Sequence, residues 1–134
     1  RPFIREEHIV DGIEGVTKYG ACVIGVPVKD TIKVVNDETT VHHTPKRSLL
    51  WAAQTPQCFW THLIMKGYEH AIKEGIVATD DSSLVEKMGH DIKMIMGSYD
   101  NIKITTPEDL IIAESLSKDM DSLLSRREIF YRSR

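Results

Sequence analysis

Four short stretches of this 134-residue chain place polar or cationic side chains beside apolar runs. They are Arg1, the segment 47–55 with Arg47 and Thr55, the run Thr79-Asp80-Asp81, and the run 101–103 that ends in Lys103. An arginine offers phosphate a planar fork of donors, and a lysine offers a point charge. In open α/β sheets, ligands collect at the ends of strands. Together the stretches predict a site for a phosphorylated polyol or a nucleotide.

Each stretch also has a purely structural interpretation. Thr79 and Asp80 suit the cap of a helix. Lys103 suits a solvent-facing strand position, and Arg47 suits the edge of a polar ribbon. Only the four stretches taken together favour a ligand site over these alternatives.

Other common site types lack their residues. His42 and His43 are neighbours, so on a strand they point to opposite faces and cannot grip one ion; we name no metal ligand. The chain contains no G-x-x-x-x-G-K-[ST], G-x-G-x-x-G or G-x-S-x-G motif. Phosphate-loop, dinucleotide and serine-hydrolase interpretations therefore lose their main support.

Charge and composition restrict the partners. The 17 basic and 20 acidic residues are mixed along the chain, so we expect no nucleic-acid partner. No apolar run approaches the roughly 18 residues of a membrane span, so we expect no membrane partner. Cys22 and Cys58 lie far apart among apolar neighbours, which favours buried thiols in a reducing compartment. We therefore expect a cytoplasmic protein.

Alternating helical and strand patterns predict a single α/β domain. Residues 4–19 form an amphipathic helix pattern whose apolar side would hold Ile4, His8, Ile9, Ile13 and Val16. Residues 21–28 predict a buried strand in a parallel sheet, and residues 29–41 a polar two-stranded ribbon that turns at Asn36-Asp37. Because a hairpin is marginal alone in water, the ribbon should lie on another surface, such as a second subunit.

The second half continues the alternation. Residues 60–75 predict a helix that ends at Gly75, and Thr79 to Asp81 could cap a short helix that stops at Gly89. Residues 91–98 predict a strand, and the sequence from Thr106 onward carries complete helix-start chemistry. Residues 119–134 include a basic tail with two aromatic side chains.

The segments "RSLLWAAQTPQCF", "ATDDSSLVE", "VPVKDTIK" and "DNIKITTPEDL" resemble the 2-C-methyl-D-erythritol 4-phosphate cytidylyltransferases. The resemblance runs from Arg1 to about Ser117. It implies the C-terminal part of a Rossmann-like, glycosyltransferase-A-like nucleotidyltransferase sheet over residues 1–118, with a β-arm at about 29–52 that joins a homodimer. It also implies Mg²⁺ and a reaction of CTP with methylerythritol phosphate that gives 4-diphosphocytidyl-methylerythritol and pyrophosphate.

The resemblance also assigns residues. Arg47, from the partner's arm, and Thr55 match the pair that holds the acceptor phosphate, and Thr31 matches an arm threonine near the substrate. Thr79 matches the substrate-contacting threonine of a T-D-D motif. Lys103 matches the lysine that positions the acceptor and stabilises charge on the reacting phosphates, so Lys103 and Arg47 are the expected catalytic residues.

Arg1 is a further expected substrate contact, since Arg1-Pro2 matches the end of a D-x-x-R-P motif. The aspartate of that motif, and the glycine-rich loop that binds CTP in the family, have no counterpart in these residues. We therefore name no nucleotide-binding residue and expect this chain alone to be inactive unless a separate fragment supplies the missing half.

Two alternatives stay open. The ribitol-5-phosphate cytidylyltransferases share "QTPQ" and "KIT", but they usually show a tyrosine and a glycine where this chain has Trp51-Ala52-Ala53. The second alternative is a dimerisation or acceptor-binding fragment without chemistry.

Overall fold

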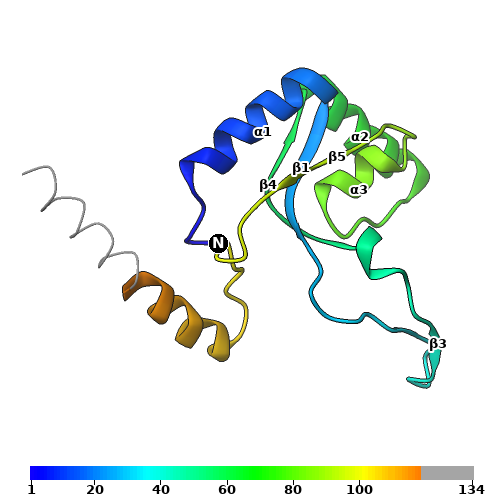
Figure 1. Cartoon of the computed structure of the whole chain (residues 1–134). Coiled ribbons are helices and arrows are strands. Elements are labelled where there is room, and N and C mark those ends of the chain that lie inside the picture. The colour runs from blue at the N-terminus through cyan, green and yellow to red at the C-terminus, as the bar shows by residue number, and fades with distance from the viewer. Residues whose placement is uncertain (119–134) are drawn as a thin grey trace, which may run out of the picture. The chain divides into compact units, whose positions relative to one another are not determined.

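The computed structural model describes residues 1–118, and the basic tail predicted for residues 119–134 lies outside them. The chain divides into two compact units, which we describe separately (Figure 1). One contains residues 4–99, and the other contains residues 1–3 together with residues 100–118 of the described chain. No described helix is long and apolar enough to cross a membrane. The division of the chain into residues 1–118 and a tail stays a prediction.

A three-stranded sheet forms the centre of the larger unit. Its middle strand β1 (Ala21–Pro27) pairs with β4 (Trp51–Phe59) in antiparallel fashion and with β5 (Lys93–Met96) in parallel. The predicted strand is confirmed, but the expected parallel sheet is correct on one side only. The chain reverses its direction from β1 to β4 through a ribbon and reverses it again from β4 to β5 through helices, so β5 runs parallel to β1.

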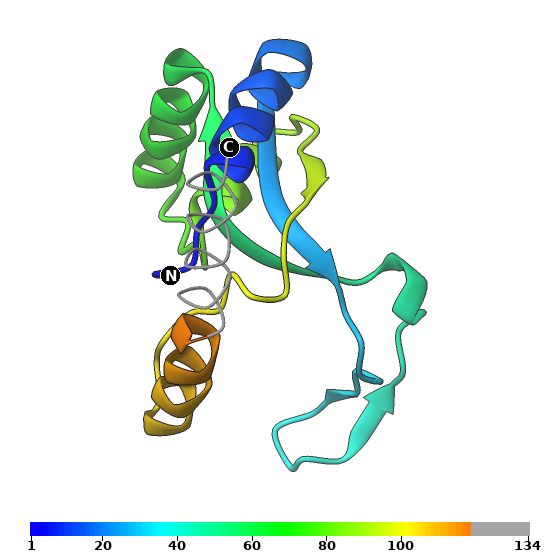
Figure 2. The same cartoon turned by 60° about the vertical axis from the view of Figure 1, so that its left-hand side comes forward.

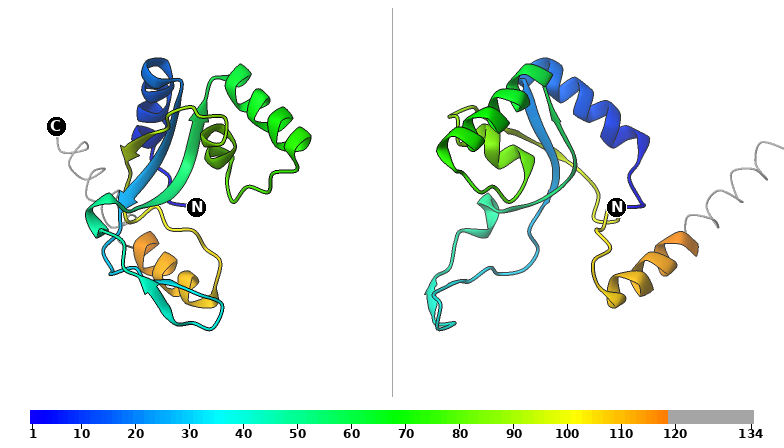
Figure 3. Two further views of the ribbon diagram at one scale, coloured as in Figure 1. Left: turned by 90° about the vertical axis from the view of Figure 1, so that its right-hand side faces the viewer. Right: turned by 180° about the vertical axis from the view of Figure 1, so that it is seen from behind.

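Helix α1 (Glu6–Tyr19) covers one face of the sheet, while α2 (Thr61–Glu74) and α3 (Asp81–Glu86) lie on the other (Figures 1 and 3). Ala21, Leu63 and Val85 form the core on the second face. Gly75 adopts φ 64° at the end of α2, the left-handed conformation that glycine tolerates best. The predicted end of this helix is confirmed.

The buried face of α1 agrees only in part with the predicted stripe, which included His8. His8, Gly12 and Gly15 are buried, whereas Ile13 is 62% exposed. A Cβ atom on Gly12 would lie 2.7 Å from Cys58 Sγ, so the glycine lets the helix approach the sheet closely. The expectation that Ile9 and Ile13 face the core was wrong because hydrophobic periodicity gives no weight to glycine.

The predicted polar ribbon is present. Strands β2 (Val34–Val35) and β3 (Val41–His43) pair in antiparallel fashion, and every residue from 29 to 44 is exposed. Figure 2 shows this segment extending away from the sheet. A hydrogen bond from the Val28 amide to the Leu50 carbonyl, 3.0 Å long, closes its base. We call residues 28–50 the arm.

The smaller unit contains a helix over residues 107–118. The Asp109 carboxylate accepts hydrogen bonds from the amides of Thr105 and Thr106, at 2.9 and 2.8 Å. These bonds hold the pKa of Asp109 below its usual value. The predicted helix start is therefore confirmed, and a carboxylate in its first turn completes it, as in half of a capping box.

Candidate functional site

Strand β4 carries the predicted substrate residue Thr55 and, two residues further on, the polar side chain of Gln57. Thr55 is exposed, and Gln57 is half-buried. The Gln57 amide nitrogen donates to an Asp80 carboxylate oxygen at 2.8 Å, while its oxygen accepts from the Ser82 amide at 3.0 Å. Gln57 therefore joins β4 to the beginning of α3.

Asp80 is the N-cap of α3. Its second carboxylate oxygen accepts from the Ser83 amide at 3.0 Å, and the Ser82 hydroxyl donates to the same oxygen as Gln57. Burial alone raises the pKa of Asp80, but the hydrogen bonds from Gln57, Ser82 and Ser83 outweigh it and leave the pKa below its ordinary value. The capping interpretation of Asp80 is confirmed. Its hydrogen bonds hold the negatively charged carboxylate in place next to Thr79.

Thr79 itself is exposed in the loop before α3. Gln57 lies two residues after Thr55 and donates to Asp80, the residue after Thr79. The Gln57 amide therefore connects the two segments that carry the predicted substrate threonines. We did not predict this role for Gln57. The sequence did offer one signal for it: the second amide of the Q-T-P-Q run, a polar side chain that a buried core strand does not require.

Arg47 and Thr31 belong to the arm. Arg47 begins a short 3₁₀ turn, η1 (Arg47–Leu49), is exposed, and donates from its guanidinium to the Lys29 carbonyl at 2.9 Å. Thr31 is exposed in the same outward segment. Within this protomer the predicted phosphate-binding arginine is thus held at the base of its own arm.

Arg1 and Lys103 belong to the other unit. The Arg1 guanidinium donates to the Asn101 carbonyl, and burial lowers the pKa of Arg1. Lys103 is exposed and lies two residues after Asn101, outside any helix or strand. This hydrogen bond places Arg1 beside the segment that carries Lys103, so two of the predicted substrate contacts share one unit.

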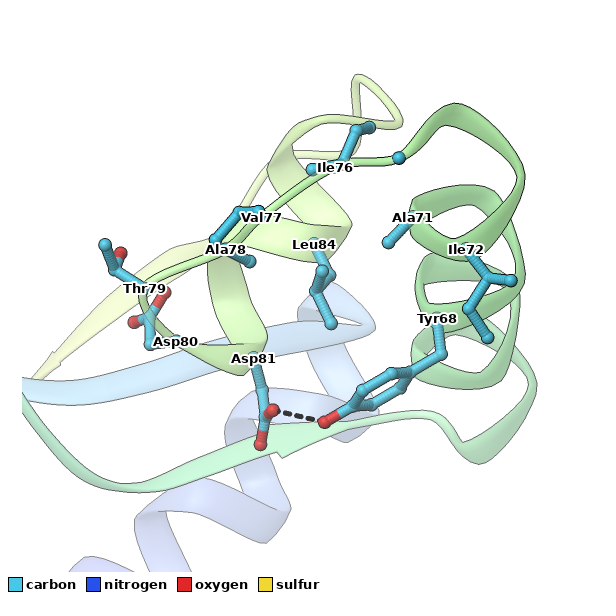
Figure 4. Close-up of a pocket in the computed structure, with 11 residues that line it drawn as sticks. Tyr68, Ala71, Ile72, Ile76, Val77, Ala78, Thr79, Asp80, Asp81 and Leu84 are labelled. Carbon is cyan, nitrogen blue, oxygen red and sulfur yellow. Dashed lines mark hydrogen bonds between the residues drawn. The ribbon is translucent and has the colours of Figure 1, made fainter.

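An apolar groove of about 580 Å³ lies between α2, the loop before α3 and α3 itself (Figure 4). Ile72, Val77 and Leu84 line it, and the Tyr68 hydroxyl donates to Asp81 at 2.6 Å beside it. Thr79 is also part of its lining. The lining contains no lysine or arginine, so the groove does not suit a phosphate group.

The described residues do not form a metal site on their own. No group of three or more His, Cys, Asp or Glu side chains in residues 1–118 is arranged to hold an ion. The Asp80 carboxylate is already occupied by the hydrogen bonds that cap α3. We therefore derive no chemical step through a metal from these residues.

Residues 1–119 match the family described as IspD, 2-C-methyl-D-erythritol 4-phosphate cytidylyltransferase. The chain belongs to this family. The match confirms the resemblance inferred from the Q-T-P-Q, T-D-D and N-I-K-I-T segments.

Individual relatives agree. A 2-C-methyl-D-erythritol 4-phosphate cytidylyltransferase from Clostridioides difficile strain 630 is 52% identical over 131 residues, which are 96% of this chain and 55% of the relative. One from Alkaliphilus oremlandii is 52% identical over 118 residues, which are 88% of this chain and 50% of the relative. The chain thus spans about half the length of the curated relatives it matches.

Solved structures confirm the fold class. The crystal structure of 4-diphosphocytidyl-2C-methyl-D-erythritol synthase from Anaerococcus prevotii superimposes with a TM-score of 0.80 at 38% identity, over 88% of this chain and 55% of that one. The cytidylyltransferase from Thermus thermophilus gives 0.78 at 32% identity, over 88% of this chain and 58% of that one. The α/β architecture of the IspD family is therefore present here, and the roles of the six predicted site residues stay predictions.

Proposed function

We propose that the full-length enzyme containing this sequence transfers a cytidylyl group from CTP to 2-C-methyl-D-erythritol 4-phosphate. The products are 4-diphosphocytidyl-2-C-methyl-D-erythritol and pyrophosphate. The observation that carries the proposal is the family match over residues 1–119, supported by relatives of 52% identity. The ribitol-phosphate alternative is not favoured by this match.

The reaction joins two phosphates. An oxygen of the acceptor phosphate attacks the α-phosphorus of CTP, the bond from that phosphorus to the bridging oxygen breaks, and pyrophosphate leaves. Catalysis of this kind depends mainly on positioning and on stabilising charge. In the proposal, Arg47 and Thr55 bind the acceptor phosphate, Thr31, Thr79 and Arg1 contact the substrate, and Lys103 positions the acceptor.

We further propose a homodimer joined through the arm. The arm has no buried residue between 29 and 44, and Val34, Val35 and Val41 expose apolar surface on it. A two-stranded ribbon is marginal alone in water, so a partner surface would stabilise it. Arg47 would then act on the partner's substrate rather than on its own protomer's.

Magnesium and a cytoplasmic location complete the proposal. The ion would reduce the repulsion between the phosphates of CTP and the acceptor. None of the steps assigned above to this chain's own side chains depends on it. Cys22 and Cys58 lie opposite each other on β1 and β4 as free thiols, a state that a reducing compartment would preserve.

Pyrophosphate release from CTP, with methylerythritol phosphate or ribitol phosphate as the acceptor, tests the proposal directly. We expect the first acceptor to be used and the second to be rejected; the reverse preference would overturn it. Arg47→Ala should raise KM for the polyol phosphate much more than KM for CTP, because the guanidinium faces the acceptor. Lys103→Ala should lower mainly kcat, and an unchanged kcat would remove Lys103 from the catalytic residues.

A further inference from the structure

The arm has little support of its own. All its residues from 29 to 44 are exposed, and its internal side-chain bonds, such as Lys33 to Thr44 at 2.8 Å, lie on the surface. Such a segment opens easily because water replaces its hydrogen bonds at small cost. Within one chain, the contacts that fix the direction of the arm therefore lie at its base, whatever a partner surface adds.

Tyr99 makes two contacts at that base. Its hydroxyl donates to the Pro27 carbonyl at 2.8 Å, and the Lys29 ammonium lies 3.7 Å from the centre of its ring. Tyr99 follows β5 in the chain, so these contacts join the segment after β5 to the base of the arm. The same Lys29 offers its carbonyl to the Arg47 guanidinium at 2.9 Å. Tyr99 and Arg47 thus both contact Lys29, the first through the ammonium group and the second through the carbonyl oxygen.

The segment that carries Tyr99 is itself fastened to the sheet. The Gly97 amide donates to the Gly25 carbonyl of β1 at 2.8 Å. The Gln54 side chain of β4 donates to the Ser98 carbonyl, also at 2.8 Å. Gln54 is 7% exposed, so this second bond is sheltered from water. Tyr99 therefore extends from a segment that is hydrogen-bonded to the sheet toward the exposed arm.

We propose that Tyr99 is a positioning residue for Arg47. It fixes the base of the arm through Pro27 and Lys29, and thereby fixes the direction in which Arg47 is presented to the acceptor phosphate. The inference rests on the proposed role of Arg47 in binding that phosphate. It concerns binding of the acceptor, not of CTP and not the chemical step.

Graded variants separate the two contacts. Tyr99→Phe removes the hydroxyl bond and keeps the ring under Lys29, so we expect KM for the polyol phosphate to rise about threefold. Tyr99→Leu removes both contacts and should raise it about tenfold. KM for CTP and kcat should stay within about twofold in both variants. Tyr19→Phe is the matched control. Like Tyr99, Tyr19 lies near lysine side chains, and it is 40% exposed compared with 46% for Tyr99. Unlike Tyr99, it lies at the end of α1 and not beside the arm.

Hydrogen exchange by mass spectrometry on peptides covering residues 28–50, in the full-length enzyme, provides a readout independent of activity. We expect exchange in the arm to accelerate in Tyr99→Leu, less in Tyr99→Phe, and not in the control. Unchanged arm exchange overturns the inference, and so does an equal rise of both KM values. If the unsubstituted enzyme does not use methylerythritol phosphate, the proposed function fails, and arm exchange alone still decides whether Tyr99 fixes the arm.

Discussion

Replacing Gln57 by alanine should uncouple β4 from α3. The substitution removes the 2.8 Å bond to the Asp80 carboxylate and leaves the amide of Ser82, a residue 8% exposed, without its acceptor. A hydrogen bond to a charged group contributes about 1.5–3 kcal/mol, and an unsatisfied buried donor costs about 1–3 kcal/mol. Because Asp80 keeps its bonds from Ser82 and Ser83, we take each loss near the low end of its range and expect a combined loss of about 2–3 kcal/mol.

Urea unfolding followed by circular dichroism measures this loss as a lower midpoint at an unchanged slope. Glu69→Ala, on the exposed surface of α2, is the control and should change the free energy of unfolding by less than about 0.5 kcal/mol. A double-mutant cycle of Gln57→Ala with Asp80→Ala should give a coupling energy of about 1 kcal/mol or more. Strict additivity, or a Gln57→Ala midpoint equal to that of the control, would refute the bridging role.

Three further stability predictions can be checked by the same urea unfolding. Gly15→Ala should destabilise by about 1–3 kcal/mol, since the added Cβ would overlap Ile95 and Cys22; an unchanged midpoint would contradict the close approach of α1. The pKa of Asp80 is lowered in the fold, so its stabilisation is present above its ordinary value of 3.8 and is lost as the pH falls below it; Asp80→Asn should flatten this acid slope. Burial raises the pKa of Cys22 from 9.0 to about 11 and also raises the pKa of Cys58 opposite it, so stability should fall as the pH rises above 9.0, and Cys22→Ala should reduce that slope.

Local signals in the sequence predicted much of the fold. Gly20 and Gly75 end α1 and α2 as expected, and Asp80 caps α3, because the chemistry of a helix end involves residues within one turn of each other. The ribbon was equally readable from its alternation and its turn residues. These features depend on near neighbours and need no knowledge of the tertiary structure.

Contacts between distant segments were not predictable in the same way. The antiparallel pairing of β4, the glycine face of α1 and the Gln57 to Asp80 bond each join residues that lie far apart in the chain. Nothing in the neighbourhood of Gln57 distinguishes an amide that binds substrate from one that fastens two elements. The sequence resemblance named residues expected to meet substrate, and the structure adds those that hold their segments in place.

The exposed arm has a consequence for how this sequence can change over evolution. Substitutions at Gly12 or Cys58 are restrained by packing inside the protomer, whereas no core restrains residues 29 to 44. In the proposed homodimer, selection on the arm would therefore come from the partner's surface and from the residues at the base of the arm. Patterns of substitution among relatives would then differ along the chain, because folding restrains the sheet while contacts in the proposed dimer restrain the arm.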